Sequence, residues 1–564
     1  MERTNSVIAE YYRSVMDIAK KARADGLVLY GAGFWGGITE RIFNIFGVSP
    51  VAFCDDDTNK QGRFFSVGSL SDTGTPIMTL DKAAMLYPNA VYIATVTSGI
   101  NAPRTSMNKR LKARGLLSAN SGFHPSRYIF LLEEPLDELE ASPSLENGFR
   151  AEHFRNLIVL KHMSNSGSIL FSSLLDGHRN IISINLFGSF VQLKDLYEQR
   201  LKHLEGLELV IEIVSQMTPF LISRYDGESI YTPELNLTRF HSDEHGEPET
   251  RILISGRIFT QKLYSEIAER GSVTFAILIK AIFAAYANSI GQRYTQGEDY
   301  WLFLDYHRVS SSFAEIDALV QPKDFEHVEY WFIIREPVQQ WFSWLKRFIA
   351  DEGADETLRL WAGRTDIYQS VLSCDLGIAF EKSPEMAGKI VRIIRFEDLK
   401  RQMEGLLRAV CSILGLLFED NMLEPTVNGI PVYFPASNKL ISKAVFAASD
   451  NTALNRSDFS SLMTSYDIFR LNVAFRRFKL AFGYDCDVPD EKSFSDAFLK
   501  DMYVYPFKFE SVLDKAIAEA SEIGYLLPDE HPFCHDYIAE LFISNLRREH
   551  EPEFFSDIIK PLDV

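Results

Sequence analysis

The sequence predicts an α/β protein in which two units of alternating strands and helices precede a helical C-terminal region. Two observations predict this fold class. Patterns of buried strands alternate with helical periodicity through both units, as in parallel sheets that carry helices on their faces. Each unit also opens with a strand that runs into a turn of small residues, at Gly31 in the first and at Ser164 in the second.

The first domain is expected over residues 1–132. A strand at Leu27–Tyr30 leads through a glycine turn into a helix that ends near residue 46, and further strands follow at 51–54 and at Val91–Ala94. This order of elements predicts a βαβ opening.

The second domain is expected over residues 151–443, after a Pro- and Glu-rich linker at 133–150. A helical region should then occupy residues 444–564, with amphipathic helices at 471–482 and 509–523. The second domain contains a helical pattern at Ser168–Leu175 and buried-strand patterns at 156–160, 300–304, 330–334 and 390–394.

Composition and charge limit the ligands. The chain has 564 residues, of which 46% are hydrophobic and 24% charged, as in globular proteins of several domains. Its 77 acidic and 58 basic residues give a net charge of -19, so the surface should repel polyanions and we expect no nucleic-acid partner. An anionic ligand must be held by local cations and backbone N–H groups.

The five cysteines are far apart and form no C-x-x-C pair, which argues against disulfides and a cysteine zinc site. No signal-peptide core follows Met1. The most hydrophobic helical run, 273–290, contains Lys280, so we expect a buried helix and no membrane span. His241 and His245 have the spacing of a helical zinc pair, but their polar surroundings favour a solvated loop, and we expect no metal site. These features predict a cytoplasmic protein.

The glycine turn of the first domain has the spacing G-x-G-x-x-G at Gly31, Gly33 and Gly36, and Asp55 ends the next strand. Glycines let a backbone approach a diphosphate, and an acidic side chain accepts hydrogen bonds from a ribose. The alternative is that the glycines only permit tight packing. No catalytic Tyr-x-x-x-Lys pair follows, so binding of a nucleotide or nucleotide-sugar is favoured over dehydrogenase activity.

This opening resembles the Rossmann-like domain found at the N-terminus of sugar acyltransferases and attached to other glycan-modifying enzymes. The resemblance covers about the first fifth of the chain. It rests on the glycine turn, Phe53-Cys54-Asp55-Asp56-Asp57, Lys60-x-Gly62 and Thr75-Pro76.

The turn of the second domain has the residues of a phosphate-binding loop. Gly167 permits close backbone approach, Ser166 and Ser168 supply hydroxyl donors, and the dipole of the following helix favours an anion. The loop lacks the G-x-x-x-x-G-K-[ST] spacing of nucleotide triphosphatases. The alternative is an ordinary turn at the start of a helix.

Two later segments add to this loop. Arg335 ends the strand at 330–334, Ser343 follows eight residues later in a helix, and Arg395-Phe396-Glu397-Asp398-Leu399 has the pattern (R/Y)-x-E-D-L. Together and in this order, the three segments resemble the sulfotransferases that use 3′-phosphoadenosine 5′-phosphosulfate (PAPS). The resemblance spans about residues 155–440 and implies a P-loop-like sulfotransferase domain.

The resemblance also implies site residues. The loop would bind the 5′-phosphosulfate of PAPS, and Arg335 with Ser343 would bind its 3′-phosphate, while the (R/Y)-x-E-D-L segment supports the fold. The predicted loop residues are Ser164, Asn165, Ser166, Gly167, Ser168 and Ile169.

One position departs from the family. The loop usually carries Lys or Arg where this chain has Asn165, and an amide brings no charge to the leaving phosphate. Lys161 and Arg308 are the nearest candidates for the missing cation. Without such a cation, the chain would be a catalytically weak or inactive donor-binding protein.

A base must take the proton of the acceptor hydroxyl. His307, after the strand at 300–304, is the first choice, and a hydrogen-bonded surface histidine is the alternative. His178 is expected to have a structural or substrate-side role.

The predicted reaction is transfer of a sulfuryl group from the small-molecule donor PAPS to a hydroxyl. The acceptor is expected to be a carbohydrate or another cell-envelope precursor, because domains that resemble the first one occur in glycan-modifying enzymes. A donor-binding protein without transfer and a Rossmann-type NAD(P)-dependent enzyme remain the alternatives.

Overall fold

The structure is a computed structural model of the chain. It describes residues 4–66, 69–71, 73–95, 103–116, 123, 128, 148–162, 166–184, 190–221, 256–267, 270, 272–306, 316–318, 320, 324–350, 389–427, 430–431, 434–436, 439–441, 462–490, 493–509, 539–540, 543, 546 and 559–561.

The chain forms two compact units that exchange segments along the sequence. The first unit comprises Met1–Phe154, Lys194–Glu298 and Val427–Ile441. The second comprises Arg155–Leu193, Asp299–Thr426 and Ser442–Val564.

The first unit contains a sheet of six strands in the order β4-β3-β5-β2-β1-β6. The four strands β5, β2, β1 and β6 are parallel, whereas β3 pairs antiparallel with both β4 and β5. The strands are β1 (Leu27–Tyr30), β2 (Ala52–Cys54), β3 (Phe64–Ser66), β4 (Ser69–Ser71), β5 (Thr75–Met78) and β6 (Val91–Ala94). The predicted βαβ opening is confirmed by this topology.

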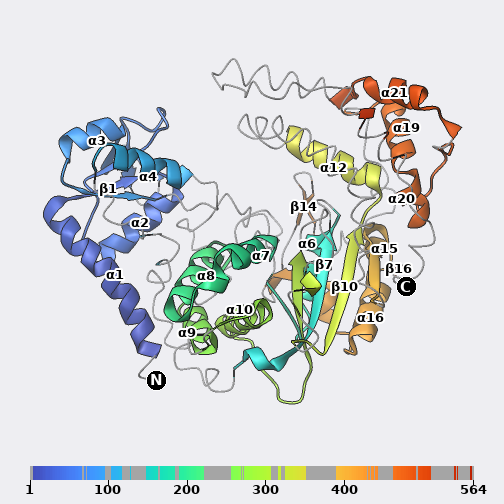
Figure 1. Cartoon of the computed structure of the whole chain (residues 1–564), viewed down its shortest axis with the longest axis horizontal. Helices are drawn as coiled ribbons and strands as arrows, with labels where there is room; N and C mark the ends of the chain where they lie inside the picture. The colour runs from blue at the N-terminus through green and yellow to red at the C-terminus, as the bar shows by residue number, and fades with distance from the viewer. Residues whose placement is uncertain are drawn as a thin grey trace. The chain divides into compact units, whose positions relative to one another are not determined.

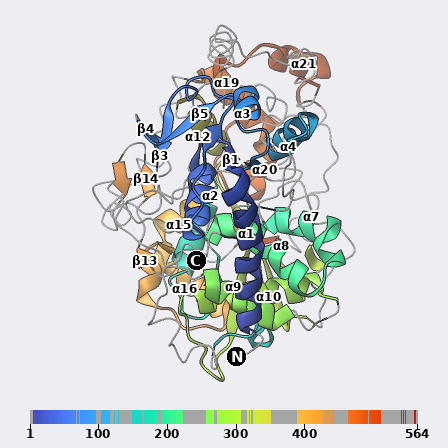
Figure 2. The ribbon, with the colours of Figure 1, turned by 90° about the vertical axis from the view of Figure 1, so that its left-hand side faces the viewer.

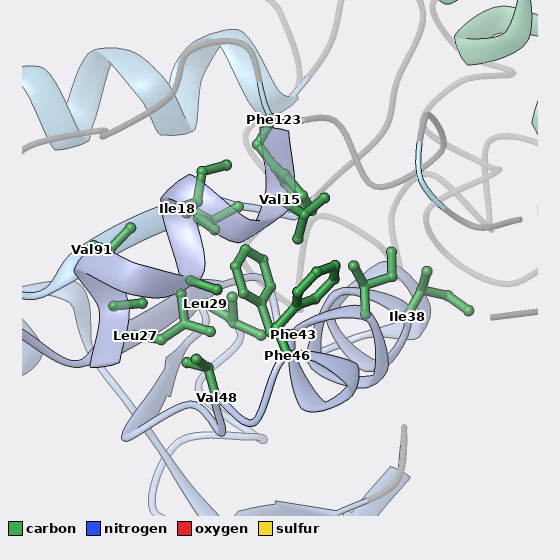
Figure 3. Packing of buried hydrophobic residues seen from close by; sticks show 14 of the residues in the cluster. Val15, Ile18, Leu27, Leu29, Ile38, Phe43, Phe46, Val48, Val91 and Phe123 are labelled. Atoms are coloured by element: carbon green, nitrogen blue, oxygen red, sulfur yellow. The ribbon is translucent and has the colours of Figure 1, made fainter. Parts of the chain in front are cut away.

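Helices cover both faces of this sheet because successive side chains of a strand point to opposite sides. Leu27 and Leu29 of β1 belong to a cluster with α1 (Thr4–Asp25) and α2 (Phe34–Ile45). Val28 and Tyr30 belong to a second cluster with α3 (Leu80–Leu86) and α4 (Pro103–Ala113). Figure 2 shows α1 running beside α2, and Figure 3 shows their buried side chains gathered with those of β1.

The first unit also contains three helices from the middle of the chain: α8 (Gly206–Leu221), α9 (Gly256–Ile267) and α10 (Phe275–Ser289). Nearly every side chain of α10 is buried, which confirms the predicted buried helix. None of the described helices has the length and hydrophobicity needed to cross a bilayer.

The second unit contains a sheet in the order β16-β11-β10-β7-β9-β8. The pairs β16–β11, β11–β10, β10–β7 and β9–β8 are parallel, which confirms the predicted α/β class (Figure 1). The strands are β7 (Phe154–His162), β8 (Ile181–Ser183), β9 (Tyr300–Tyr306), β10 (His327–Ile334), β11 (Val391–Arg395) and β16 (Ile559–Pro561).

Helices follow four of these strands, and α7 (Phe190–Gln199) is the one that follows β8. The helix α6 (Ser168–Leu175) follows β7, α12 (Pro337–Ala350) follows β10, and α15 (Phe396–Arg401) with α16 (Met403–Leu414) follows β11. Trp331 and Trp341 are buried, so they pack as core residues.

The described part of the C-terminal region is mainly helical, as predicted. It contains α19 (Ser465–Ala474), α20 (Arg476–Ala481) and α21 (Asp496–Val504). The prediction of a single helix at 471–482 is wrong, because a break in the helical conformation at Phe475 separates α19 from α20. Almost all of the helix expected at 509–523 lies outside the described residues, as does most of the predicted linker.

Candidate functional site

Neighbouring parallel strands of the second unit end at the same edge of its sheet. The pairing register places His162 of β7 opposite Ile333 of β10, and Ile334 opposite Arg395 of β11. The end of β7 and Arg335, which follows β10, therefore lie at one edge of the sheet. Ligands of open parallel sheets bind beyond the carboxyl ends of the strands.

The loop after β7 ends in a conformation that suits an anion. Gly167 precedes α6 with φ +93°, in the left-handed region, and it has no side chain to cap the N–H groups at the helix start. Ser166 is fully buried, and its Oγ has no hydrogen-bond partner among the described residues. Ser168 is also buried, whereas Ile169 in the first turn is 43% exposed. A ligand oxygen would accept hydrogen bonds from the Ser166 hydroxyl and from the N–H groups at the start of α6.

The ring of Phe396 joins this loop to Arg335. A Cβ added to Gly167 would lie 2.1 Å from Cδ2 of Phe396, so the loop backbone rests on the ring edge. The Cζ atom of Arg335 lies 4.9 Å from the centroid of the same ring. Two segments far apart in the sequence thus meet at one aromatic side chain.

Arg335 is a half-buried cation among acidic groups. Burial lowers the pKa of its guanidinium, and the charges of Glu397 and Glu336 act in the opposite direction. Ser343 lies two helical turns further on in α12 and is half-buried. An anion beside Arg335 would have to compete with the two carboxylates.

A cavity of about 320 Å³ opens beside Arg335, and we call it the Arg335 cavity. This volume lies within the range of small-molecule sites, which is about 300 to 1,000 Å³. Residues from the start of α12, from α15, from α19 and from α20 with the turn after it line the cavity: Arg335, Glu336, Val338, Gln339, Phe396, Glu397, Arg401, Ile468, Asn472, Lys479, Tyr484 and Asp485.

Two contacts fix the C-terminal helices to the strand ends around this cavity. Lys479 Nζ forms an ion pair with Glu336 Oε1 at 2.9 Å, and both side chains are largely buried. The Tyr484 hydroxyl donates to Glu397 Oε2 at 2.9 Å. Burial and the neighbouring charge of Glu397 raise the pKa of Tyr484 well above its ordinary value, so this hydroxyl keeps its proton. The C-terminal region is therefore part of the wall of the cavity.

The (R/Y)-x-E-D-L segment holds the end of β11. Arg395 donates from Nε and Nη2 to the two oxygens of Asp398 at 2.5 and 2.8 Å, and from Nη1 to the carbonyl of Phe482 at 3.2 Å. Glu397 accepts the backbone N–H of Glu336 at 3.0 Å. These bonds tie β10, β11 and the end of α20 together, in keeping with the expected support of the fold.

A second polar pair lies at the same edge of the sheet. His162 Nε2 and Asp305 Oδ1 are 2.6 Å apart, and both side chains are almost fully buried. Lys161, on the opposite face of β7, is fully buried and its Nζ lies 5.7 Å from the centroid of Phe332. Its role as the missing cation stays a prediction.

Four predicted site residues, Ser164, Asn165, His307 and Arg308, lie outside the described residues. His178 has structural contacts: its ring nitrogens pair with the carbonyl of Leu417 at 2.8 Å and with the N–H of Asn180 at 3.0 Å.

The glycine turn of the first unit contains glycines with different constraints. Gly31 has φ +114°, and its N–H donates to the carbonyl of Cys54. A Cβ on Gly36 would lie 2.3 Å from the Gly31 carbonyl oxygen, so glycine is required there for helix–strand packing. No atom lies within 4 Å of a Cβ built on Gly33, which leaves this position open.

The carboxylate of Asp55 accepts hydrogen bonds and forms an ion pair within the first unit. Its Oδ2 accepts the N–H of Ala32 at 2.7 Å and pairs with Lys60 Nζ at 3.3 Å, and its Oδ1 accepts the N–H of Asp57. The carboxylate thus fixes the glycine turn. Its contact with a ribose stays a prediction.

Three residues near the site were missed in the sequence: Lys400, Lys479 and Tyr484. Lys400 could have been predicted to lie near Phe396, because it follows Phe396 by four residues on the same face of a helix. The positions of Lys479 and Tyr484 could not have been predicted from a local pattern, because their partners lie in distant segments.

No protein-family model matches the chain, and no curated protein matches it. Two solved sulfotransferase domains are similar to part of it. That of the Synechococcus PCC 7002 olefin synthase has 16% identity and a TM-score of 0.30, over 59% of this chain and 97% of that one. That of the curacin biosynthetic pathway has 17% identity and a TM-score of 0.25, over 66% of this chain and 99% of that one.

Proposed function

We propose that the second unit binds PAPS and transfers its sulfuryl group to a hydroxyl. One observation carries this proposal: Gly167 and Arg335 meet at the ring of Phe396. A bisphosphorylated adenosine has two anionic groups a few ångströms apart. Gly167 contacts the edge of the Phe396 ring and Arg335 lies over the same ring, so the two could offer donors to two such groups.

Each end of the donor has matching groups. Backbone N–H groups at the start of α6 and the hydroxyls of Ser166 and Ser168 would bind the 5′-phosphosulfate, and Arg335 would bind the 3′-phosphate. Phe396 offers a ring surface between the two.

The proposed chemistry is a displacement at sulfur. The acceptor oxygen forms a bond to sulfur while the bond from sulfur to the 5′-phosphate oxygen breaks, and 3′,5′-diphosphoadenosine leaves with the electron pair. The hydroxyl proton goes to a base, for which His307 stays the prediction. As in phosphoryl transfer, positioning and stabilisation of charge on the leaving oxygen supply most of the rate.

The proposed acceptor is a carbohydrate or another hydroxyl-bearing envelope precursor. The first unit would assist by binding a nucleotide or nucleotide-sugar at Gly31, Gly33 and Gly36. This part of the proposal follows from the resemblance of the first domain, and the open position at Gly33 leaves room for a ligand.

Calorimetry with 3′,5′-diphosphoadenosine tests the donor site. Arg335→Ala should weaken binding about 10- to 100-fold, the usual loss for a charged hydrogen-bonding partner. Arg408→Ala is the matched control, because Arg408 is exposed on α16 and pairs with Glu404. Equal affinity of the wild type and Arg335→Ala would refute the proposed donor site.

Asn165 supports a second candidate, a donor-binding protein with little transfer. In that case Asn165→Lys should raise the rate of PAPS turnover strongly from a nearly inactive parent. An active parent that gains little from this substitution would favour the transferase.

A further inference from the structure

The short helix α15 presents different side chains to different surroundings. Phe396 and Lys400 are four residues apart and share one face, and Glu397 and Arg401 share the next. Glu397 and Arg401 line the Arg335 cavity together with Phe396, but Lys400 is not among the described residues that line it. Lys400 therefore lies along the face whose aromatic ring supports Gly167.

Lys400, Arg335 and the loop meet around the ring of Phe396. Lys400 Nζ lies 5.7 Å from the ring centroid, and Arg335 Cζ lies 4.9 Å from it. The ring edge at Cδ2 faces the backbone of Gly167. Two cations are thus held against the ring that contacts Gly167 at the start of α6, where helix N–H groups favour an anion.

The two cations disfavour each other in the free protein. Burial lowers the pKa of Lys400, and the positive charge of Arg335 lowers it further. Contact with the aromatic face of Phe396 favours the charged form of both side chains. An anion bound near the ring would counter both the burial and the repulsion.

The loop itself supplies no charge at the position where PAPS-dependent enzymes usually carry Lys or Arg, because this chain has Asn165 there. Lys400, on α15, lies against the ring that contacts Gly167.

We propose that Lys400 is a catalytic residue that supplies the positive charge missing at Asn165. This inference rests on the proposed function. When the sulfur–oxygen bond breaks, the electron pair moves to the 5′-phosphate oxygen of the donor, and the ammonium of Lys400 stabilises that charge. The acceptor oxygen bonds to sulfur, and its proton goes to the base.

The test measures two quantities on the full chain: affinity for 3′,5′-diphosphoadenosine, and the rate at which PAPS is hydrolysed with water as the acceptor. Lys400→Met should lower the rate about 100-fold, as loss of one group that stabilises a developing charge does, while affinity changes much less. Lys400→Arg should keep most of the rate. Adding Asn165→Lys to Lys400→Met should restore it, which a merely structural role of Lys400 would not allow.

Arg408→Met is the control for loss of a positive charge elsewhere, and it should leave the rate and the affinity unchanged. If PAPS is hydrolysed and Lys400→Met keeps the wild-type rate, the inference is overturned. It is also overturned if Lys400→Met weakens binding as much as Arg335→Ala and leaves the rate at saturation unchanged. If the wild type does not bind 3′,5′-diphosphoadenosine, the proposed function itself fails, and the role of Lys400 fails with it.

Discussion

Gly167 and Phe396 are in direct contact, and no larger residue fits at position 167 without displacing the ring. The built Cβ would lie 2.1 Å from Cδ2 and 2.5 Å from Cε2 of Phe396. The backbone there also has a positive φ, which disfavours residues with a Cβ.

We expect Gly167→Ala to weaken binding of 3′,5′-diphosphoadenosine at least about 10-fold and to cost about 1 to 3 kcal/mol of stability. Gly415→Ala is the matched control, because Gly415 has φ +69° but no atom within 4 Å of its Cβ. Calorimetry and denaturant midpoints measure the two effects. Equal losses for both variants would show that backbone strain, and not the Phe396 contact, is responsible.

The ion pair between Lys479 and Glu336 should be worth more than a surface pair. Lys479→Met leaves a largely buried carboxylate without its cation, and we expect a loss of about 3 kcal/mol. The same change in the exposed pair, Arg408→Met beside Glu404, should cost at most about 0.5 kcal/mol. Chemical unfolding followed by tryptophan fluorescence makes the comparison, and similar losses would contradict the prediction.

Two glycines of the first unit should respond oppositely to alanine. Gly36→Ala forces a Cβ against the Gly31 carbonyl, so we expect a destabilisation of about 1 to 3 kcal/mol. Gly33→Ala meets open space at an extended φ of −140° and should change stability little. Thermal unfolding of the two variants tests this pair. A larger loss at Gly33 would mean that the packing argument is wrong.

Asp467 should make the stability of the C-terminal helices depend on pH in the acid range. Burial alone would raise its pKa, but hydrogen bonds from Thr464 and Arg470 lower the pKa below its ordinary value. The stabilisation is therefore complete above the unfolded pKa of about 3.9, and it is lost as the pH falls through the lower folded pKa. Denaturant midpoints between pH 7 and pH 2 should fall less steeply for Asp467→Asn than for the wild type, whereas Asp17→Asn, an exposed control, should follow the wild type.

Local patterns predicted the elements whose structure depends on nearby residues. The helix Ser168–Leu175 has the predicted bounds because a glycine turn precedes it and an apolar run fills it. The strand β16 was not predicted, because its three residues gain their structure from pairing with β11 in a distant part of the chain. The break at Phe475 was also missed, since a continuous apolar periodicity runs through it.

The candidate site could be predicted only in part. Gly167 and Arg335 were found through a motif, but their common contact with Phe396 depends on the alignment of three strand ends. The cavity walls could not be predicted, because α19 and α20 follow the strands by many residues, and ion pairs such as Lys479 with Glu336 leave no local pattern.

The pairing of β16 with β11 has a consequence for biosynthesis. During translation β11 leaves the ribosome long before residues 559–561 are synthesised. The backbone groups at the outer edge of β11 therefore remain unpaired with β16 while the intervening segment is made. Such an open edge can recruit a strand from another nascent chain. Premature termination upstream of Ile559 would make that exposure permanent, and the shortened product should be prone to aggregate.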